Sequence, residues 1–134
     1  MVEDDLLHVL EIEKLCFSDP WCINMFQEAV YAYECLVLTD LDSILGFFIG
    51  FGVLDEYEIY NVVIRPDAQS KGYGKYLMKY AILQHNGRYN KYFLEVRKSN
   101  LPAISLYKSI GFNEIYVRKD YYKKPVEDAI VFLL

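Results

Sequence analysis

The chain has 134 residues, of which 54% are hydrophobic and 16% aromatic, and its formal net charge is −5. This length predicts one compact domain over residues 1–134, and the acidic balance argues against a protein whose main task is binding nucleic acid. No uninterrupted apolar run reaches the roughly 18 residues that a membrane span needs, and the acidic residues 1–5 are unlike a signal peptide. The three cysteines lack metal-ligand spacing, so we expect free thiols in the cytoplasm and no metal.

The first third of the chain predicts two helices followed by two strands. Apolar residues recur at near-helical intervals over residues 4–17. Pro20 suits the first position of a second helix, which we expect to run to about Tyr33. Strands are predicted at 34–38 and 43–54 around a polar turn, and glycines in the second of them indicate bulges or close packing.

A strand, a glycine-containing loop and a helix form the most informative stretch. The strand covers residues 58–64 and ends at Pro66, and the helix has an apolar stripe that begins at Gly74. Glycine at a helix start lets a phosphate approach free N–H groups, where the helix dipole favours its charge. The spacings of a Walker loop and of a dinucleotide fingerprint are absent. A short pyrophosphate cradle is therefore predicted, with a glycine-eased turn without ligand as the alternative; its candidate residues are Gln69, Ser70, Lys71, Gly72, Tyr73, Gly74 and Lys75.

The remaining third predicts a strand at 91–97, a short helix, and a final antiparallel pair of strands at 113–119 and 129–134. Asn100 is placed to cap the start of the short helix, and Gly111 its end. Strands and helices alternate in the middle of the chain, with hairpins on either side. This order predicts an α/β fold in which helices cover a mixed sheet.

Several separated motifs resemble the acetyl-CoA signature of the GNAT acetyltransferases. They are Gln69-x-x-Gly72-x-Gly74, Leu94-Glu95-Val96-Arg97-Lys98-Ser99-Asn100, Ala103-Ile104-x-Leu106-Tyr107 and Gly111-Phe112. The stretch Arg118-Lys119-Asp120-Tyr121-Tyr122 is similar to one branch, the bacterial ribosomal-protein-alanine N-acetyltransferases (RimI-like). The resemblance implies a mostly antiparallel mixed sheet with a central splayed pair of parallel strands and helices on both faces. This fold usually starts with a strand before its first helix, for which the chain has little room.

The resemblance also implies acetyl-CoA as co-substrate, with its pyrophosphate on the cradle. Its pantetheine arm would pair with the main chain of Val62, Val63 and Ile64, and the Val63 N–H would polarise the thioester carbonyl. Asn100 resembles a polar contact to the cofactor, and it can cap its helix at the same time. Gln69 stands where many relatives carry arginine, which removes one charge from the cradle.

Acetyl transfer needs a neutral amine, a base and an acid. A peptide α-amine has a pKa near 7.7–8.0, so its deprotonation at neutral pH costs about 1 kcal/mol, against about 4–5 kcal/mol for lysine. The resemblance implies Glu95 as the base and Tyr107 as the acid that protonates the departing thiolate. Judged by the residues alone, Glu95 could form a salt bridge to Arg97 or a lysine, and Tyr107 could be a core residue. Glu58 is the second candidate base.

Acetyl transfer to the N-terminal α-amine of a protein is the predicted reaction, with the N-terminal alanine of a small-subunit ribosomal protein as the expected acceptor. The alternatives are a GNAT enzyme that acts on lysine or a small amine, and a non-catalytic CoA-binding module. We expect a monomer or weak homodimer without contact to nucleic acid or membrane. Candidates for the acceptor mouth are Trp21, Phe26, Tyr121 and Tyr122.

Overall fold

The computed structural model describes all residues 1–134 as six strands, four α-helices and two short 3-10 helices. The first half contains η1 (Glu3–Asp5), α1 (Leu6–Cys16), α2 (Ile23–Ala32), β1 (Glu34–Asp40), β2 (Ser43–Val53), β3 (Glu56–Ile64) and η2 (Pro66–Ala68). The second half contains α3 (Tyr73–Gln84), β4 (Lys91–Arg97), α4 (Leu101–Ile110), β5 (Asn113–Lys123) and β6 (Val126–Leu133). None of the helices combines the length and the apolar composition that crossing a bilayer requires.

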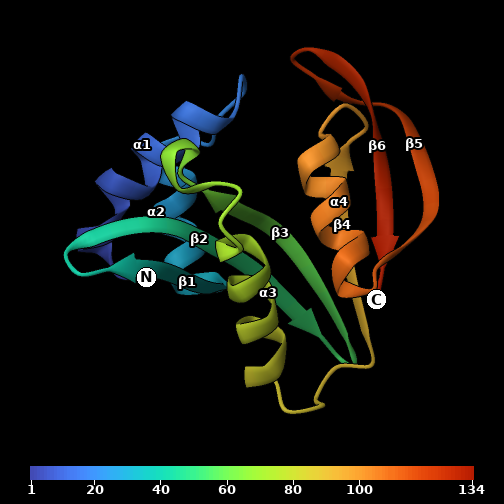
Figure 1. The fold of residues 1–134 in the computed structure, drawn as a ribbon, viewed down its shortest axis with the longest axis horizontal. Helices are drawn as coiled ribbons and strands as arrows, with labels where there is room; N and C mark the ends of the chain where they lie inside the picture. Colours follow the sequence, from blue (N-terminus) through green and yellow to red (C-terminus); the bar gives the residue numbers. More distant parts are fainter.

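All six strands form one sheet in the order β1-β2-β3-β4-β6-β5, and only β3 and β4 run parallel. Residues 56–59 of β3 pair with residues 91–94 of β4, and there the pairing stops. Beyond this point β3 pairs only with β2, and β4 only with β6. Figure 1 shows the two halves of the sheet meeting at the lower end and diverging above it. The predicted mixed sheet with a splayed central pair is confirmed.

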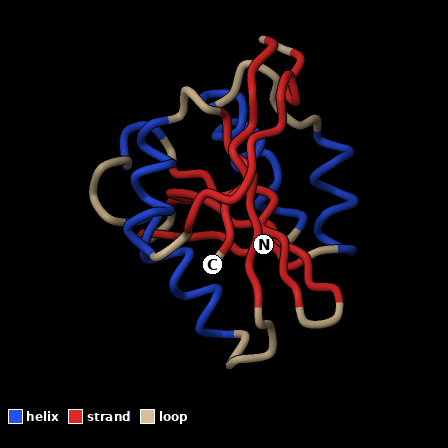
Figure 2. The backbone as a smooth tube through the Cα atoms, turned by 90° about the vertical axis from the view of Figure 1, so that its right-hand side faces the viewer, coloured by secondary structure: helices blue, strands red, loops and turns tan.

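Helices cover both faces of the sheet, as predicted (Figure 2). The face under α3 and α4 holds the larger core, whose helix residues pack on β2, β3, β4 and β6. The opposite face holds a second core, in which α1 and α2 pack on β2 and β3. This second core contains no residue of β4, β5 or β6. No helix therefore packs a core on the outer half of that face, which β4, β5 and β6 form.

A bulge at Tyr60 reverses the alternation of β3. Gly50 of β2 stands opposite Ile59, but the next residue, Ile49, stands opposite Asn61, so Tyr60 is the extra residue. Before the bulge, Ile59 faces the core under α3 and α4. After it, Val63 faces the core under α1 and α2. The bulge thus lets one strand contribute to both cores.

The start of α2 differs from the prediction, because the helix begins at Ile23 and not at Pro20. The N–H of Trp21 donates to Oε1 of Glu13 at 3.1 Å. Cys22 then adopts an extended conformation as the N-cap of α2. The segment between the two helices is consequently longer than expected, and Trp21 belongs to it.

The two edges of the sheet are formed by β1 and β5. Within residues 1–134 no strand precedes α1, and the Met1 ammonium donates to the Cys35 carbonyl of β1 at 3.1 Å. At the other edge, most of residues 120–128, expected to connect the last two strands, is strand, because β5 extends to Lys123 and β6 begins at Val126. Its register with β6 shifts between Arg118 and Tyr122. Asp120, in this shift, has a φ of 51° and donates its N–H to Asp128.

A polar cluster that the sequence did not reveal lies where β3 and β4 are still paired. We call this part of the sheet its closed end. His85 follows α3, and its side chain is 8% exposed. Its Nδ1 lies 2.9 Å from the Tyr92 hydroxyl, and its Nε2 lies 2.7 Å from the Glu34 carboxylate. Tyr57 also donates to Glu34, at 3.0 Å. The cluster links β1, β3, β4 and the end of α3 where the parallel strands are still paired.

Candidate active site

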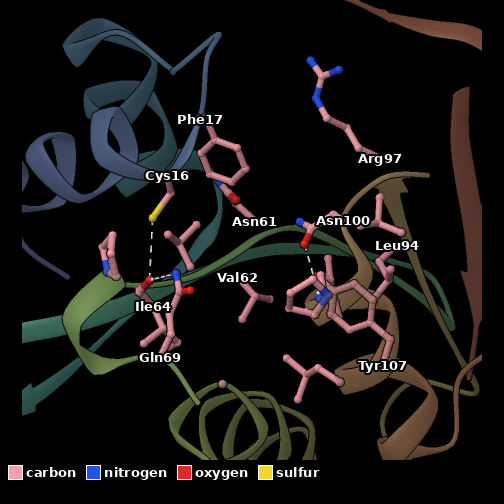
Figure 3. Close-up of a pocket in the computed structure, with 18 of the residues that line it drawn as sticks. Cys16, Phe17, Asn61, Val62, Ile64, Gln69, Leu94, Arg97, Asn100 and Tyr107 are labelled. Atoms are coloured by element: carbon pink, nitrogen blue, oxygen red, sulfur yellow. Dashed lines mark hydrogen bonds between the residues drawn. The ribbon is translucent and has the colours of Figure 1, made fainter. Parts of the chain in front are cut away.

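A cavity of about 1070 Å³ opens between the diverging ends of β3 and β4 (Figure 3). Its walls come from the end of α1 and the segment after it, the ends of both strands, the start of α3, and α4. Ordinary small-ligand pockets have volumes of roughly 300–1,000 Å³. The cavity therefore has room for a ligand at least as large as an ordinary small molecule.

The end of β3 offers free main-chain groups to this cavity. The Arg65 N–H donates to the Leu45 carbonyl at 2.7 Å, and in an antiparallel ladder every second residue makes such bonds. Val63 is therefore bonded to β2, whereas Val62 and Ile64 direct their N–H and C=O groups toward the gap. Of the three residues expected to contact the ligand through their main chain, Val62 and Ile64 have free groups at the gap, whereas the Val63 N–H expected at the thioester carbonyl lies in the ladder with β2. The contacts of Val62 and Ile64 with a ligand stay a prediction. The Ile64 carbonyl already accepts from Gln69 Nε2 at 2.9 Å.

The two glycines at the start of α3 serve different purposes. Gly72 is the N-cap with a φ of +86°, and no atom lies within 4 Å of the place where a Cβ would stand. Because no side chain caps α3, the first N–H groups of the helix remain open to a ligand. Gly74 permits close packing, since a Cβ there would lie 3.0 Å from Cδ2 of Leu106 on α4. Gly72 is therefore the glycine that suits a phosphate.

The other cradle residues divide into two groups. Gln69, Ser70, Tyr73 and Lys75 line the cavity together with the glycines. Lys71 is exposed and lies outside the cavity lining. Lys75 is consequently the cradle cation that faces the cavity.

Asn100 caps α4 as predicted. Its Oδ1 accepts from the Ala103 N–H at 3.3 Å, and the residue also lines the cavity (Figure 3). The cap occupies the amide oxygen. Its contact with a cofactor stays a prediction.

Tyr107 lies on α4, is 7% exposed, and lines the cavity. Its ring packs 6.1 Å from the ring of Phe112 and 6.1 Å from that of Phe132. Burial raises the pKa of its phenol above the ordinary value, and nearby Tyr122 adds to the shift. Every fully buried polar side-chain atom has a hydrogen-bond partner. Since the chain provides none for the Tyr107 hydroxyl, this group is open to the cavity and stays protonated.

Glu95 lines the cavity from β4, and Glu58 does not. An ion pair joins Oε1 of Glu95 to Nε of Arg118 on β5 at 3.0 Å. Arg97, the partner considered from the sequence, pairs with Glu127 at 3.3 Å instead. Desolvation, with a smaller contribution from Glu95, raises the pKa of Glu58. Of the two candidate bases, the structure places Glu95 at the cavity wall.

Two of the four candidates for the acceptor mouth line the cavity, namely Trp21 and Tyr122. Tyr121 is 48% exposed and stands outside the lining. The expectation for Phe26 was wrong, because its side chain is fully buried between Trp21 and Phe47. Phe26 therefore supports Trp21 from the core.

Glu13 is the site residue that the sequence analysis missed. It is 2% exposed, lines the cavity, and accepts hydrogen bonds through both carboxylate oxygens. Desolvation raises the pKa of its carboxyl, and the hydrogen bonds from Trp21 and Asn61 oppose that shift in part. A signal was present in the sequence, since Glu13 stands four residues after Val9 in the buried stripe of α1.

These features suit a ligand that has a phosphate at one end and an amide-bearing arm. The open helix start fits the phosphate, and the free edge of Val62 and Ile64 fits the arm as an added strand. A free phenol and a carboxylate stand further along the same cavity. Fold and cavity together define a transferase that uses a coenzyme A thioester.

The comparisons with known proteins identify the family. Residues 6–112 match the model of the acetyltransferase (GNAT) family. The chain is 36% identical to the [ribosomal protein bS18]-alanine N-acetyltransferase of Haemophilus ducreyi, with 100% of the chain and 96% of that relative covered. It is 38% identical to the enzyme of that name from Salmonella typhimurium, over 97% of the chain and 90% of the relative. The crystal structure of the ribosomal-protein-S18-alanine N-acetyltransferase from Escherichia coli matches with a TM-score of 0.90 and 35% identity, covering 100% and 89% of the two chains.

The chain therefore belongs to the acetyltransferase (GNAT) family. It is an N-acetyltransferase with acetyl-CoA as its donor. The structure contains no group of three or more His, Cys, Asp or Glu side chains that would hold a metal ion.

Gly72→Ala tests the cradle, and Gly87→Ala is its matched control. Both glycines have a positive φ, 86° and 78°, and neither has an atom within 4 Å of a Cβ. Each substitution should lower the free energy of unfolding by about 1–2 kcal/mol, because alanine is strained in this conformation. Only Gly72→Ala should weaken acetyl-CoA binding, by about tenfold, since only its methyl group would stand at the open helix start. Calorimetric titration and urea denaturation measure both effects, and equal acetyl-CoA affinities of the two variants would contradict the cradle.

Proposed function

We propose that this enzyme acetylates the N-terminal α-amine of a protein, with the N-terminal alanine of ribosomal protein bS18 as the acceptor. The reaction is placed in the cytoplasm, where ribosomal proteins are made. The observation that carries the proposal is the extent of the similarity to the bS18-alanine N-acetyltransferases. It covers 100% of the chain in the Haemophilus ducreyi relative, whereas the family match ends at residue 112. The similarity thus includes β5 and β6, which contribute Tyr122 to the cavity and Arg118 to the Glu95 ion pair.

Glu95 is the proposed base. An α-amine loses its proton at neutral pH at a cost of only about 1 kcal/mol, so a carboxylate suffices, directly or through a water. Arg118 balances the Glu95 charge, and its side chain is 50% exposed. The guanidinium can therefore turn to solvent when a cationic acceptor reaches the carboxylate.

Tyr107 is the proposed acid. Acetyl-CoA supplies the activated acyl group, and its departing thiolate needs a proton or a hydrogen bond. The Tyr107 phenol stays protonated because burial raises its pKa, and no group of the chain competes for its hydroxyl. The free N–H groups of Val62 and Ile64 would orient the arm of the co-substrate, and the start of α3 would hold its pyrophosphate.

A pair of peptides tests the acceptor. One begins with a free alanine, and the other is blocked at its N-terminus and carries an internal lysine. Thiol release from acetyl-CoA should occur with the first peptide alone, because its amine is the more easily deprotonated. Release with the second would assign the site to lysine. Binding of acetyl-CoA without release in either case would leave a small-amine acceptor or a non-catalytic module.

Glu95→Gln should lower kcat/KM for the alanine peptide by about 10²–10⁴-fold, the usual contribution of a positioned base. Glutamine has nearly the same shape, so β4 keeps its pairing. Glu58→Gln is the matched comparison from the same face of the sheet, and its activity should stay near that of the wild type. Steady-state kinetics of both variants decide between them: a loss confined to Glu58→Gln would make Glu58 the base.

Tyr107→Phe should lower kcat by about 10²-fold or more, because a positioned acid contributes that much. The affinity for acetyl-CoA should change little, since the ring and its packing remain. Stopped-flow turnover and calorimetric titration separate the two quantities. Turnover at the wild-type rate would remove Tyr107 from the mechanism.

A further inference from the structure

Glu13 is the only charged residue among the buried residues of this protein, with 2% of its surface exposed. Its Oε1 accepts from the Trp21 N–H at 3.1 Å, and its Oε2 accepts from Nδ2 of Asn61 at 3.1 Å. Both oxygens of one buried carboxylate are therefore committed to two segments that lie far apart in the sequence.

Each of the two partners belongs to the cavity wall. Trp21 belongs to the segment between α1 and α2, and four residues of that segment line the cavity: Phe17, Ser18, Asp19 and Trp21. Asn61 is the first residue after the bulge of β3 and also lines the cavity. Figure 3 shows Phe17 and Asn61 on the α1 side of the gap, across from Asn100 and Tyr107. Glu13 thus connects the segment between α1 and α2 to β3 through hydrogen bonds.

Burying a charged carboxylate at position 13 costs free energy of desolvation. Burial disfavours its charged form and raises its pKa, and only the two hydrogen bonds offset that cost. The neighbouring core positions of α1 are apolar, namely Leu6, Val9 and Ile12. An apolar residue at position 13 would avoid the desolvation, but it could accept neither bond. What the glutamate adds is the link between Trp21 and Asn61.

The link joins Trp21, a candidate for the acceptor mouth, to Asn61, and Glu13 itself forms no hydrogen bond with a residue proposed to hold acetyl-CoA. The start of α3 and the residues of α4 form no hydrogen bond with Glu13, whose only partners are Trp21 and Asn61. Trp21 is further held by the Phe26 ring, 5.2 Å away between centroids. Movement of the segment between α1 and α2 would therefore change the acceptor mouth and leave the cradle unchanged.

We propose that Glu13 is a positioning residue for the acceptor: it fixes the segment between α1 and α2 against the bulge of β3 and so sets the geometry of the acceptor mouth. The proposal rests on the proposed function, because the acceptor it concerns is the N-terminal segment of a protein. It assigns no proton transfer to Glu13.

Glu13→Ala and Glu13→Gln test this role, with Glu11→Ala as the control. Glu11 is an exposed residue of the same helix. Glutamine can accept from the Trp21 N–H and donate to Oδ1 of Asn61 once the Asn61 amide turns over. Glu13→Ala should raise KM for the alanine peptide by about tenfold or more, since small displacements in a site have effects of that size. Its affinity for acetyl-CoA should remain within about twofold of the wild type, and Glu13→Gln and Glu11→Ala should keep KM close to the wild-type value.

Trp21 provides a second readout that needs no turnover. It is the only tryptophan in the chain, so tryptophan fluorescence reports on this segment alone. Glu13→Ala should shift the emission to longer wavelength and increase quenching by acrylamide, whereas Glu13→Gln and Glu11→Ala should leave both unchanged. If the wild type acetylated no α-amine peptide, the proposed function would fail, and the fluorescence comparison would still decide whether Glu13 holds the segment.

Two outcomes would overturn the proposal. One is a Glu13→Ala protein with wild-type KM and wild-type Trp21 fluorescence. The other is an equal loss in Glu13→Gln, which would assign the effect to the charge of Glu13. If circular dichroism shows that Glu13→Ala does not fold, Asn61→Ala removes one of the two hydrogen bonds in its place. A raised KM for the alanine peptide is then expected, and an unchanged KM would overturn the proposal equally.

Discussion

The early end of the pairing between β3 and β4 is the constraint on which the rest of this structure depends. The two parallel strands share hydrogen bonds only over residues 56–59 and 91–94. Beyond these residues each strand keeps its antiparallel neighbour but is no longer paired with its parallel one. Both strands therefore have an unpaired edge inside the sheet. The cluster of His85, Glu34, Tyr57 and Tyr92 holds the closed end together with hydrogen bonds of 2.7–3.0 Å. Because these hydrogen bonds hold β3 and β4 together at the closed end, the strands can separate at the other end while the sheet remains one unit.

The split sheet also explains how a phenol and a carboxylate from opposite faces reach one cavity. Tyr107 lies on α4, in the core with Leu94 and Val96 of β4. Glu95 lies between these two residues in β4, so its side chain points to the opposite face. In a continuous sheet the backbone would separate the two groups. Here both line the gap, so a thioester held between the strands would have the acceptor on one side and the Tyr107 phenol on the other.

Three acidic side chains near the cavity show how environment divides their roles. Glu13 is buried and accepts two hydrogen bonds, so it suits a fixed structural link. Glu95 is partly exposed and forms an ion pair with Arg118, whose side chain is 50% exposed. Glu58 shares its face with Glu95 but stands outside the cavity lining. Residue type alone does not distinguish the three.

The sequence by itself determined the fold class, because hydrophobic periodicity and glycine spacing act locally: β4 lies at residues 91–97 as predicted, and Asn100 and Gly111 delimit α4. It also indicated the motifs that place Glu95 and Tyr107 at one cavity. Only the tertiary structure decided the partner of Glu95, since Arg118 reaches it from β5 through the register of three strands. The bulge at Tyr60 turned the Val63 side chain to the core under α1 and α2, and the fold of α1 against β3 buried Glu13 beside Asn61. Such outcomes depend on register and on contacts between distant segments, which local periodicity does not encode.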